Sequence, residues 1–167
     1  MASADFTRLF QPRGIAIIGA STDLGRPGAQ TVQVLTQQGY QGGIYPVNPK
    51  YQEIQGRPCF ASVADIKAPC DLAVIALPAA HVPDTITLCG KSGIRFAVVV
   101  GGGFREMGPD GVERERLMLK AAREAGIRFV GPNCLGFVNI HDRVFAGFGS
   151  ITRPPYLKPG AVSAVIQ

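Results

Sequence analysis

The chain has 167 residues, of which 46% are hydrophobic, 17% charged and 8% aromatic, with no Trp. This length fits one domain with an aliphatic core, and the composition excludes a disordered chain. The net charge is +5, but the basic residues are scattered, which argues against nucleic acid and favours a small anionic ligand.

No apolar run approaches the roughly 18 residues of a membrane-spanning helix, so no membrane association is expected. The first residues lack the apolar stretch of a signal peptide, which predicts a cytoplasmic protein. The four cysteines form no C-x-x-C pair and share no spacing with the two histidines. A metal site and a disulfide framework are therefore not predicted.

Five short apolar runs predict strands at residues 15–18, 44–47, 72–77, 96–100 and 127–130. Most of these runs are nearly continuous, whereas strands with one exposed face alternate between apolar and polar residues. Continuous runs are typical of parallel strands that are covered on both faces. The sequence therefore predicts a parallel sheet and argues against antiparallel hairpins.

Helices are predicted between these strands, at residues 28–38, 82–91 and 112–125. The first places Ala29, Val32 and Leu35 near one side and stops at Gly39, as a helix with a glycine C-cap would. Only one helical turn, at residues 63–66, is expected in the proline-rich connection between the second and third strands.

The clearest helix is the one at residues 112–125, where Leu117, Ala121 and Ala125 lie four apart before Gly126. Strands and helices thus alternate along the chain, which predicts right-handed crossovers. The expected fold is α/β, a Rossmann-like open parallel sheet with helices on both faces.

The C-terminal part has a different composition, rich in Gly and Pro, with a weak strand pattern at residues 144–148. A new apolar run then begins at Ala161. We predict a ligand-binding domain at 1–140, a linker with short strands at 141–160, and the truncated first strand of a following domain at 161–167. The chain is expected to be a fragment of a larger protein.

The segment IAIIGASTDLGRPG, residues 15–28, is a strand, a glycine-rich turn and a helix start. Gly19 and Gly25 allow the backbone to turn sharply and approach an anion, and the helix N-terminus offers unpaired N–H groups. The turn also provides polar donors: Ser21, Thr22 and Arg26. A phosphate site is the prediction, and a tight turn between packed elements is the alternative.

At the end of the second strand, a NAD-binding protein usually presents an Asp or Glu to the ribose. This chain instead has the sequence YPVNPK at residues 45–50. Lys50 is suited to an additional ribose phosphate, which is the 3′-phosphate in coenzyme A (CoA) and the 2′-phosphate in NADP. A solvated loop lysine is the alternative.

The remaining strand ends also carry residues that suit a long cofactor. Pro78, Gly101 and Gly102 follow the third and fourth strands and leave room at the edge where ligands bind to open parallel sheets. Asn133 and Cys134 follow the fifth strand. A lone Cys is more often a small buried residue than a nucleophile, so no catalytic residue is assigned.

Together, the motifs PRGIAIIGASTDLGRPG, GGIYPVNPKYQEIQG, DLAVIALPAAHVP, GGGF and GIRFVGPNCLGFVN resemble the N-terminal CoA-binding domain of NDP-forming acyl-CoA synthetases. These enzymes are relatives of the succinyl-CoA synthetase alpha subunit. The resemblance extends over residues 10–139, with the motifs in the order of the family. The chain departs from the family at Gly101 and Gly102, where a Ser or Thr would be expected.

The resemblance implies that residues 21–24 contact the CoA phosphates, that Lys50 lies near the adenosine end, that residues 100–102 border the pantetheine, and that residues 133–134 lie toward the thiol. The full set of expected CoA contacts is Gly19, Ser21, Thr22, Asp23, Leu24, Gly25, Arg26, Asn48, Pro49, Lys50, Pro78, Val100, Gly101, Gly102, Asn133 and Cys134.

The resemblance also implies a function: part of an acid–thiol ligase that forms acyl-CoA through an acyl phosphate and a phosphohistidine, the histidine lying in another domain. Expected partners are the remaining synthetase domains or an ATP-grasp subunit, with self-association also open. Two other functions stay open, a CoA-sensing regulatory domain fused to a protein lysine acetyltransferase and an NADP-binding oxidoreductase domain.

Overall fold

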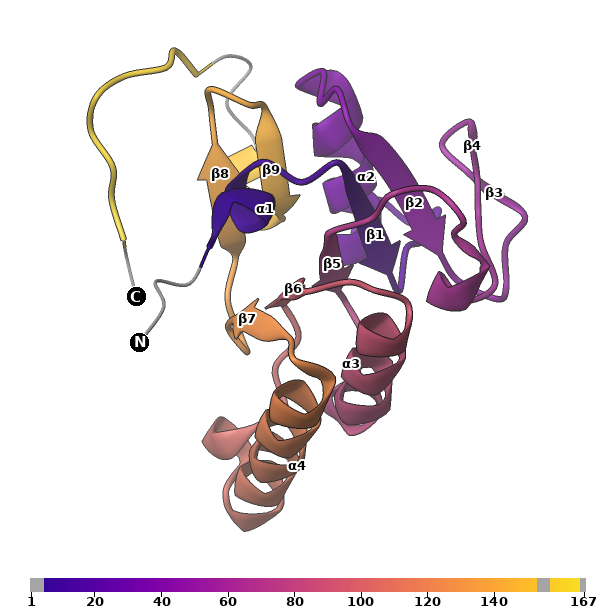
Figure 1. The fold of residues 1–167 in the computed structure, drawn as a ribbon, viewed down its shortest axis with the longest axis vertical. Coiled ribbons are helices and arrows are strands. Elements are labelled where there is room, and N and C mark those ends of the chain that lie inside the picture. Colours follow the sequence, from indigo (N-terminus) through magenta and orange to yellow (C-terminus); the bar gives the residue numbers. More distant parts are fainter. Residues whose placement is uncertain (1–4, 153–156, 166–167) are drawn as a thin grey trace.

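The computed structural model describes residues 5–152 and 157–165 and contains a central parallel sheet (Figure 1). The sheet has five strands: β1 (Gly14–Ile18), β2 (Gly43–Val47), β5 (Leu72–Ile75), β6 (Phe96–Val99) and β7 (Arg128–Val130). Their order is β2-β1-β5-β6-β7, and all neighbours are parallel. The five predicted strands and their parallel arrangement are confirmed.

Both faces of this sheet are covered. Helix α2 (Pro27–Gln37) packs on one face, while α3 (Val82–Lys91) and α4 (Pro109–Ala125) pack together on the other (Figure 1). Every residue of β1, β5 and β6 is buried as a result, which is why these strands lack polar alternation. The predicted Rossmann-like fold with helices on both faces is confirmed.

The buried faces of the helices were predicted with unequal success. In α2, Ala29, Val32 and Leu35 are fully buried, as predicted. In α4, the predicted face is confirmed at Ala121, which is buried, but is wrong at Leu117, which is 40% exposed while the neighbouring Met118 is fully buried. A spacing of four drifts around a helix of 3.6 residues per turn, and contact with α3 selects the neighbouring stripe.

Helix α4 begins three residues before its predicted start, with Pro109 in its first turn. Its C-terminus is capped by Gly126 in the left-handed conformation, as expected for a glycine stop. No helix in the described part of the chain is both long and apolar enough to cross a membrane.

Several short elements escaped prediction because two to four residues give too little periodicity. These elements are α1 (Thr7–Phe10), β3 (Glu53–Ile54), β4 (Arg57–Pro58), η2 (Ala79–His81), η3 (Arg105–Met107) and η4 (Gly149–Thr152). The helical turn predicted at 63–66 is present as η1 (Val63–Asp65). A hairpin of β3 and β4 thus lies in the connection between β2 and β5.

An antiparallel hairpin of β8 (Gly136–Asn139) and β9 (Val144–Gly147) packs beside α2 (Figure 1). The strand pattern at 144–148 is confirmed by β9, whose residues are buried in the core on that face of the sheet. The pairing of β8 with β9 crosses the division drawn at residue 140. The expectation against antiparallel hairpins holds within the five-stranded sheet but is wrong for β3–β4 and β8–β9, which lie outside it.

Farther along, residues 161–165 form no strand, and Val162 and Val165 are exposed. Residues 166–167 of the predicted strand, and Pro154 and Pro155 of the predicted linker, lie outside the described residues. The division into domains stays a prediction.

An ion pair fixes the amino end of the sheet. Asp71, just before β5, accepts hydrogen bonds from the backbone N, Nε and Nη2 of Arg13 at 2.8, 3.0 and 2.6 Å. Asp71 is only 7% exposed, and the hydrogen bonds from Arg13 lower the pKa of its carboxyl. The start of β1 is thereby held to the start of β5.

Replacing Asp71 with Asn is expected to lower the free energy of unfolding by about 1–3 kcal/mol at pH 7, since a charged acceptor is lost. A carboxyl with a lowered pKa stabilises the fold above its unfolded pKa, and this stability is lost as pH falls through the folded pKa. Urea titrations should therefore show that the difference in unfolding free energy between wild type and Asp71→Asn shrinks below about pH 4. The exposed Glu53→Gln is the control, and equal effects of both variants would contradict the role of Asp71.

Candidate functional site

The carboxyl ends of β2, β1 and β5 open into a cavity of about 720 Å³, which is within the usual size range for cofactor pockets. It lies at the point of the sheet where the chain crosses to the other face, the usual ligand position in open α/β sheets. Its lining includes Gly19, Ser21, Asp23, Arg26, Asn48, Pro49, Lys50, Tyr51, Ser62, Val63, Leu77, Pro78, His81, Thr85 and Leu88.

The turn between β1 and α2 requires glycine at two positions. Gly19 has φ +87°, and a Cβ there would lie 2.4 Å from the carbonyl oxygen of Ala76. A Cβ at Gly28 would lie 2.4 Å from the carbonyl oxygen of Gly19. At Gly25 a Cβ would meet only the Asp23 side chain, so the steric need for glycine belongs to Gly19 and Gly28.

The loop after Gly19 is shaped by short-range hydrogen bonds. Asp23 N donates to Ser21 Oγ at 3.1 Å, and Gly25 N donates to Asp23 Oδ1 at 2.9 Å. Helix α2 then begins without a side-chain cap and with no acidic residue in its first turn. Pro27 has no N–H, and the N–H of Ala29 already donates to the carbonyl oxygen of Arg26 at 3.1 Å, so this helix start favours an anion mainly through its positive dipole end.

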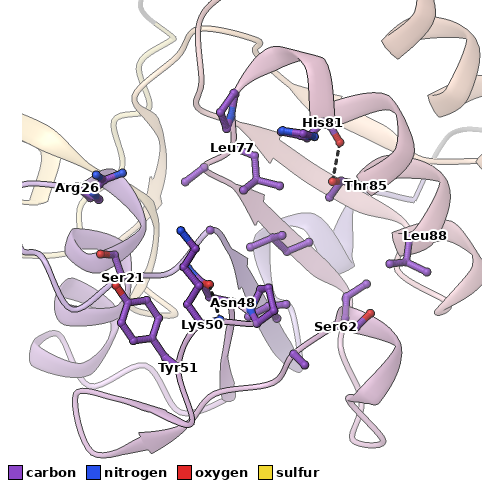
Figure 2. Close-up of a pocket in the computed structure, with 18 of the residues that line it drawn as sticks. Ser21, Arg26, Asn48, Lys50, Tyr51, Ser62, Leu77, His81, Thr85 and Leu88 are labelled. Atoms are coloured by element: carbon purple, nitrogen blue, oxygen red, sulfur yellow. Dashed lines mark hydrogen bonds between the residues drawn. The ribbon is translucent and has the colours of Figure 1, made fainter.

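The tip of β2 forms the neighbouring wall. Asn48 Nδ2 donates to the carbonyl oxygen of Ala20 at 2.7 Å, and Asn48 Oδ1 accepts from Lys50 N at 3.0 Å. The Asn48 amide therefore connects the loop after β1 to the tip of β2, and both ends of the amide already have partners within the protein. The exposed side chain of Lys50 extends from this tip between the two walls of the cavity (Figure 2).

Tyr51 is a site residue that the sequence analysis missed, although its position next to Lys50 was a clue. Its hydroxyl hydrogen-bonds with Thr22 and Ser21, and these bonds lower the pKa of Tyr51. The positive charges of Lys50 and Arg26 lower it further. Hydroxyl groups and two cations thus face the same part of the cavity (Figure 2).

Tyr51 is expected to ionise at lower pH than Tyr40 and Tyr45, since desolvation by burial raises the pKa of both of those. Tyr51→Phe should therefore remove an early step from the tyrosinate absorbance titration. An anionic ligand beside Tyr51 should raise the pKa of Tyr51 and delay that step. An unchanged early step in Tyr51→Phe would show that another tyrosine is responsible; Tyr45→Phe is the control.

The opposite wall comes from η1, the loop after β5 and the start of α3. It presents the apolar side chains of Leu77 and Leu88 and the hydroxyls of Ser62 and Thr85 (Figure 2). Pro78 also lines the cavity here. The sequence analysis identified only Pro78 on this wall. The others come from segments whose approach to the cavity depends on how α3 packs, which no local pattern reveals.

One group of expected contacts lies away from the cavity: Val100, Gly101, Gly102, Asn133 and Cys134. They follow β6 and β7 on the adjoining part of the same sheet edge. Asn133 N donates to the carbonyl oxygen of Gly101 at 3.0 Å. A Cβ at Gly101 would lie 2.6 Å from the Leu77 carbonyl oxygen, which explains why the chain has no Ser or Thr there.

Cys134 lies in a half-buried position, with Sγ 3.6 Å from the carbonyl oxygen of Val99. Burial raises the pKa of this thiol, so the geometry does not activate it as a nucleophile. Among the described residues, no group of three or more His, Cys, Asp or Glu side chains is arranged to hold a metal ion.

The predicted contacts therefore fall into three sets. Those that line the cavity are Gly19, Ser21, Asp23, Arg26, Asn48, Pro49, Lys50 and Pro78. Those in the same loop but outside the lining are Thr22, Leu24 and Gly25. The third set is the group after β6 and β7. What the three sets contact stays a prediction.

A glycine-rich turn at an uncapped helix start, with a cation at the tip of β2, is typical of domains that bind nucleotide cofactors. The profile of the CoA binding domain family matches residues 13–140. The chain belongs to this family.

Known proteins of this kind are similar over most of the chain. ADP-forming acetate–CoA ligase II of Archaeoglobus fulgidus is 40% identical over 163 residues, 98% of this chain and 24% of that protein. The alpha subunit of ADP-forming acetate–CoA ligase II of Pyrococcus furiosus is 39% identical over 145 residues, 86% of this chain and 31% of the subunit. The chain thus spans a third or less of these relatives.

A solved structure is also similar, the dinucleotide-forming acetyl-coenzyme A synthetase 1 of Ca. Korarchaeum cryptofilum in complex with phosphate and ADP. Its TM-score is 0.86 at 38% sequence identity, and the match covers 93% of this chain and 32% of that one. The fold and the sequence therefore agree on the same family.

Proposed function

We propose that the chain binds CoA and forms the CoA-binding part of an NDP-forming acyl-CoA synthetase. The observation that supports this most strongly is the cavity at the sheet edge, where Lys50, Arg26 and the uncapped start of α2 meet in a member of the CoA-binding family. These groups are suited to the several phosphates of CoA.

Lys50 is assigned to the 3′-phosphate of the CoA ribose. The β2 tip presents Asn48, Pro49 and Lys50 to the cavity. This tip has no Asp or Glu that could accept hydrogen bonds from the two free hydroxyls of a ribose. A ribose with an extra phosphate is therefore preferred over the diol of NAD. This feature alone suits NADP as well, and family membership favours CoA.

The remaining nucleotide groups are assigned by the chemistry of the two walls. The pyrophosphate is placed at the β1–α2 turn, where Ser21, Thr22 and Arg26 offer donors. The adenine is placed against the apolar wall of Leu77 and Leu88. The pantetheine then passes along residues 100–102, and its thiol lies toward Asn133 and Cys134.

In this proposal the domain binds CoA and directs its thiol to the sheet edge. Transfer of the acyl group through an acyl phosphate and a phosphohistidine belongs to other domains. The proposed partners are the remaining synthetase domains or an ATP-grasp subunit, in a cytoplasmic assembly. The relatives that are ADP-forming acetate–CoA ligases support an acid–thiol ligase with ADP as the nucleotide product.

Calorimetry with CoA, dephospho-CoA and NADP tests this assignment. CoA is expected to bind at least about tenfold more tightly than dephospho-CoA, since one charge-assisted contact is lost. NADP is expected to bind more weakly than CoA. Tighter binding of NADP would identify an oxidoreductase domain instead, and the absence of CoA binding would overturn the proposed function.

A further inference from the structure

The glycine-rich loop is held from outside by few side chains. Residues 22–26 are exposed, and the bonds that Asp23 accepts within this stretch connect only near neighbours. Asn48 holds the start of the loop at Ala20, and the Tyr51 hydroxyl bonds with Ser21 and Thr22. The far part of the loop is held by Gln30, whose Nε2 donates to the carbonyl oxygen of Leu24 at 3.1 Å.

The same Gln30 amide has a second partner far along the chain. Its Oε1 accepts a hydrogen bond from the backbone N–H of Gly149 at 3.0 Å. Gly149 is the first residue of η4, directly after the hairpin β8–β9. One side chain on α2 therefore joins the candidate phosphate loop to the segment after the hairpin, and both partners are backbone groups.

The surface from which Gln30 acts is itself fixed. Thr31 is the next residue on α2, and its buried hydroxyl lies 2.9 Å from the carbonyl oxygens of both Gly147 and Pro27, which share its one proton. Thr31 thus attaches α2 to the end of β9 without contacting the loop. The attachment of α2 to β9 therefore keeps Gln30 beside the segment that begins at Gly149.

The chemistry of the side chain explains why an amide suits this place. Leu24 offers an acceptor and Gly149 offers a donor, so the bridging group needs one donor and one acceptor. Glutamine supplies both, a carboxylate supplies only acceptors, and methionine of similar length supplies neither strong donor nor strong acceptor.

From these contacts we propose that Gln30 is a positioning residue that couples the phosphate loop to η4. It holds the Leu24 end of the loop in place before a ligand arrives. A ligand that orders the loop then stabilises the Gly149 end in return, because such coupling is reciprocal. The effect on CoA rests on the proposed function, whereas the coupling in the free chain does not.

The free chain is tested first, by nuclear magnetic resonance on wild type, Gln30→Glu and Gln30→Met. In Gln30→Glu the Leu24 carbonyl resonance should shift while the Gly149 amide keeps its slow hydrogen exchange. In Gln30→Met the Leu24 carbonyl resonance should also shift, and hydrogen exchange of the Gly149 amide should become faster by about three- to tenfold. Wild-type Gly149 exchange in a folded Gln30→Met would overturn the proposal. If Gln30→Met does not fold, Gln30→Glu alone tests it, and an unchanged Leu24 resonance overturns it.

CoA binding is tested second, by calorimetry and by exchange of the Gly149 amide. CoA should slow this exchange in wild type but not in Gln30→Met, whose affinity should fall by about three- to tenfold. Gln37→Met is the matched control, because it makes the same substitution at an exposed position of α2 outside the cavity lining, and its affinity for CoA should equal that of wild type. Equal slowing in wild type and Gln30→Met would overturn the coupling. If wild type binds no CoA, the proposed function fails, and the result with the free chain still decides the role of Gln30.

Discussion

Gly19→Ala is expected to lower the free energy of unfolding by about 2–5 kcal/mol and to abolish measurable CoA binding. Gly19 has φ +87°, where an L side chain is strained, and its Cβ would be 2.4 Å from the Ala76 carbonyl oxygen. Relief of this contact requires the β1 turn and the loop after β5 to separate. Both segments line the cavity, so their separation would change the shape of the proposed CoA site.

Gly25→Ala is the matched control for Gly19→Ala. It lies in the same loop, its φ is not in the left-handed region, and its Cβ would meet only the side chain of Asp23. We expect a change in unfolding free energy below about 0.5–1 kcal/mol. Urea titrations of both variants, followed by calorimetry with CoA, make the comparison. Similar effects of the two substitutions would show that the contact with Ala76 does not constrain the turn.

Lys50→Ala is expected to weaken CoA binding by about 10- to 100-fold, the usual range for a hydrogen bond to a charged group. The loss should be specific to the 3′-phosphate. Wild type should distinguish CoA from dephospho-CoA, and Lys50→Ala should bind the two with nearly equal affinity. Stability should change little, because Lys50 is exposed at the tip of a loop.

Lys91→Ala controls for the change in net charge. Lys91 is exposed in the last turn of α3, away from the cavity lining. Its removal should leave the affinities for CoA and dephospho-CoA close to those of wild type. An equal loss of CoA affinity in Lys50→Ala and Lys91→Ala would show that Lys50 acts only through the net charge of the protein. If Lys50→Ala still binds CoA more tightly than dephospho-CoA, the 3′-phosphate does not contact Lys50.

The sheet was predictable because its strands are buried on both faces. Leu72–Ile75 and Phe96–Val99 are apolar at every position, so hydrophobicity alone reveals them. The bounds of α3 were predicted to the residue, since Pro83 and Asp84 mark its first turn and Gly93 follows its end. These features depend on local sequence and burial only.

Other features depend on tertiary contacts that no local pattern contains. Leu117 and Met118 are equally apolar, and only the packing of α4 on α3 decides which is buried. All four residues of strand β8 are half-buried, so no alternation of buried and exposed residues marks it, and the strand is recognised only by its pairing with β9. Tyr51 becomes a site residue because its hydroxyl reaches Ser21 from a different loop.

The glycine-rich turn also shows that sequence alone does not reveal which glycines are sterically required. Gly19, Gly25 and Gly28 are alike in sequence, yet only Gly19 and Gly28 meet backbone atoms at a Cβ distance of 2.4 Å. The spacing indicated a phosphate turn, and the structure shows which glycines the turn needs.

The most direct test of the CoA site is a map of CoA-induced chemical-shift changes on the isotope-labelled chain. The largest changes are expected at residues 19–26 and 48–51, with a second group at 100–102 and 133–134. Dephospho-CoA should reproduce this map except near Lys50. Changes confined to the opposite edge of the sheet, around Arg13 and Asp71, or no changes with excess CoA, would contradict the placement of CoA in this cavity.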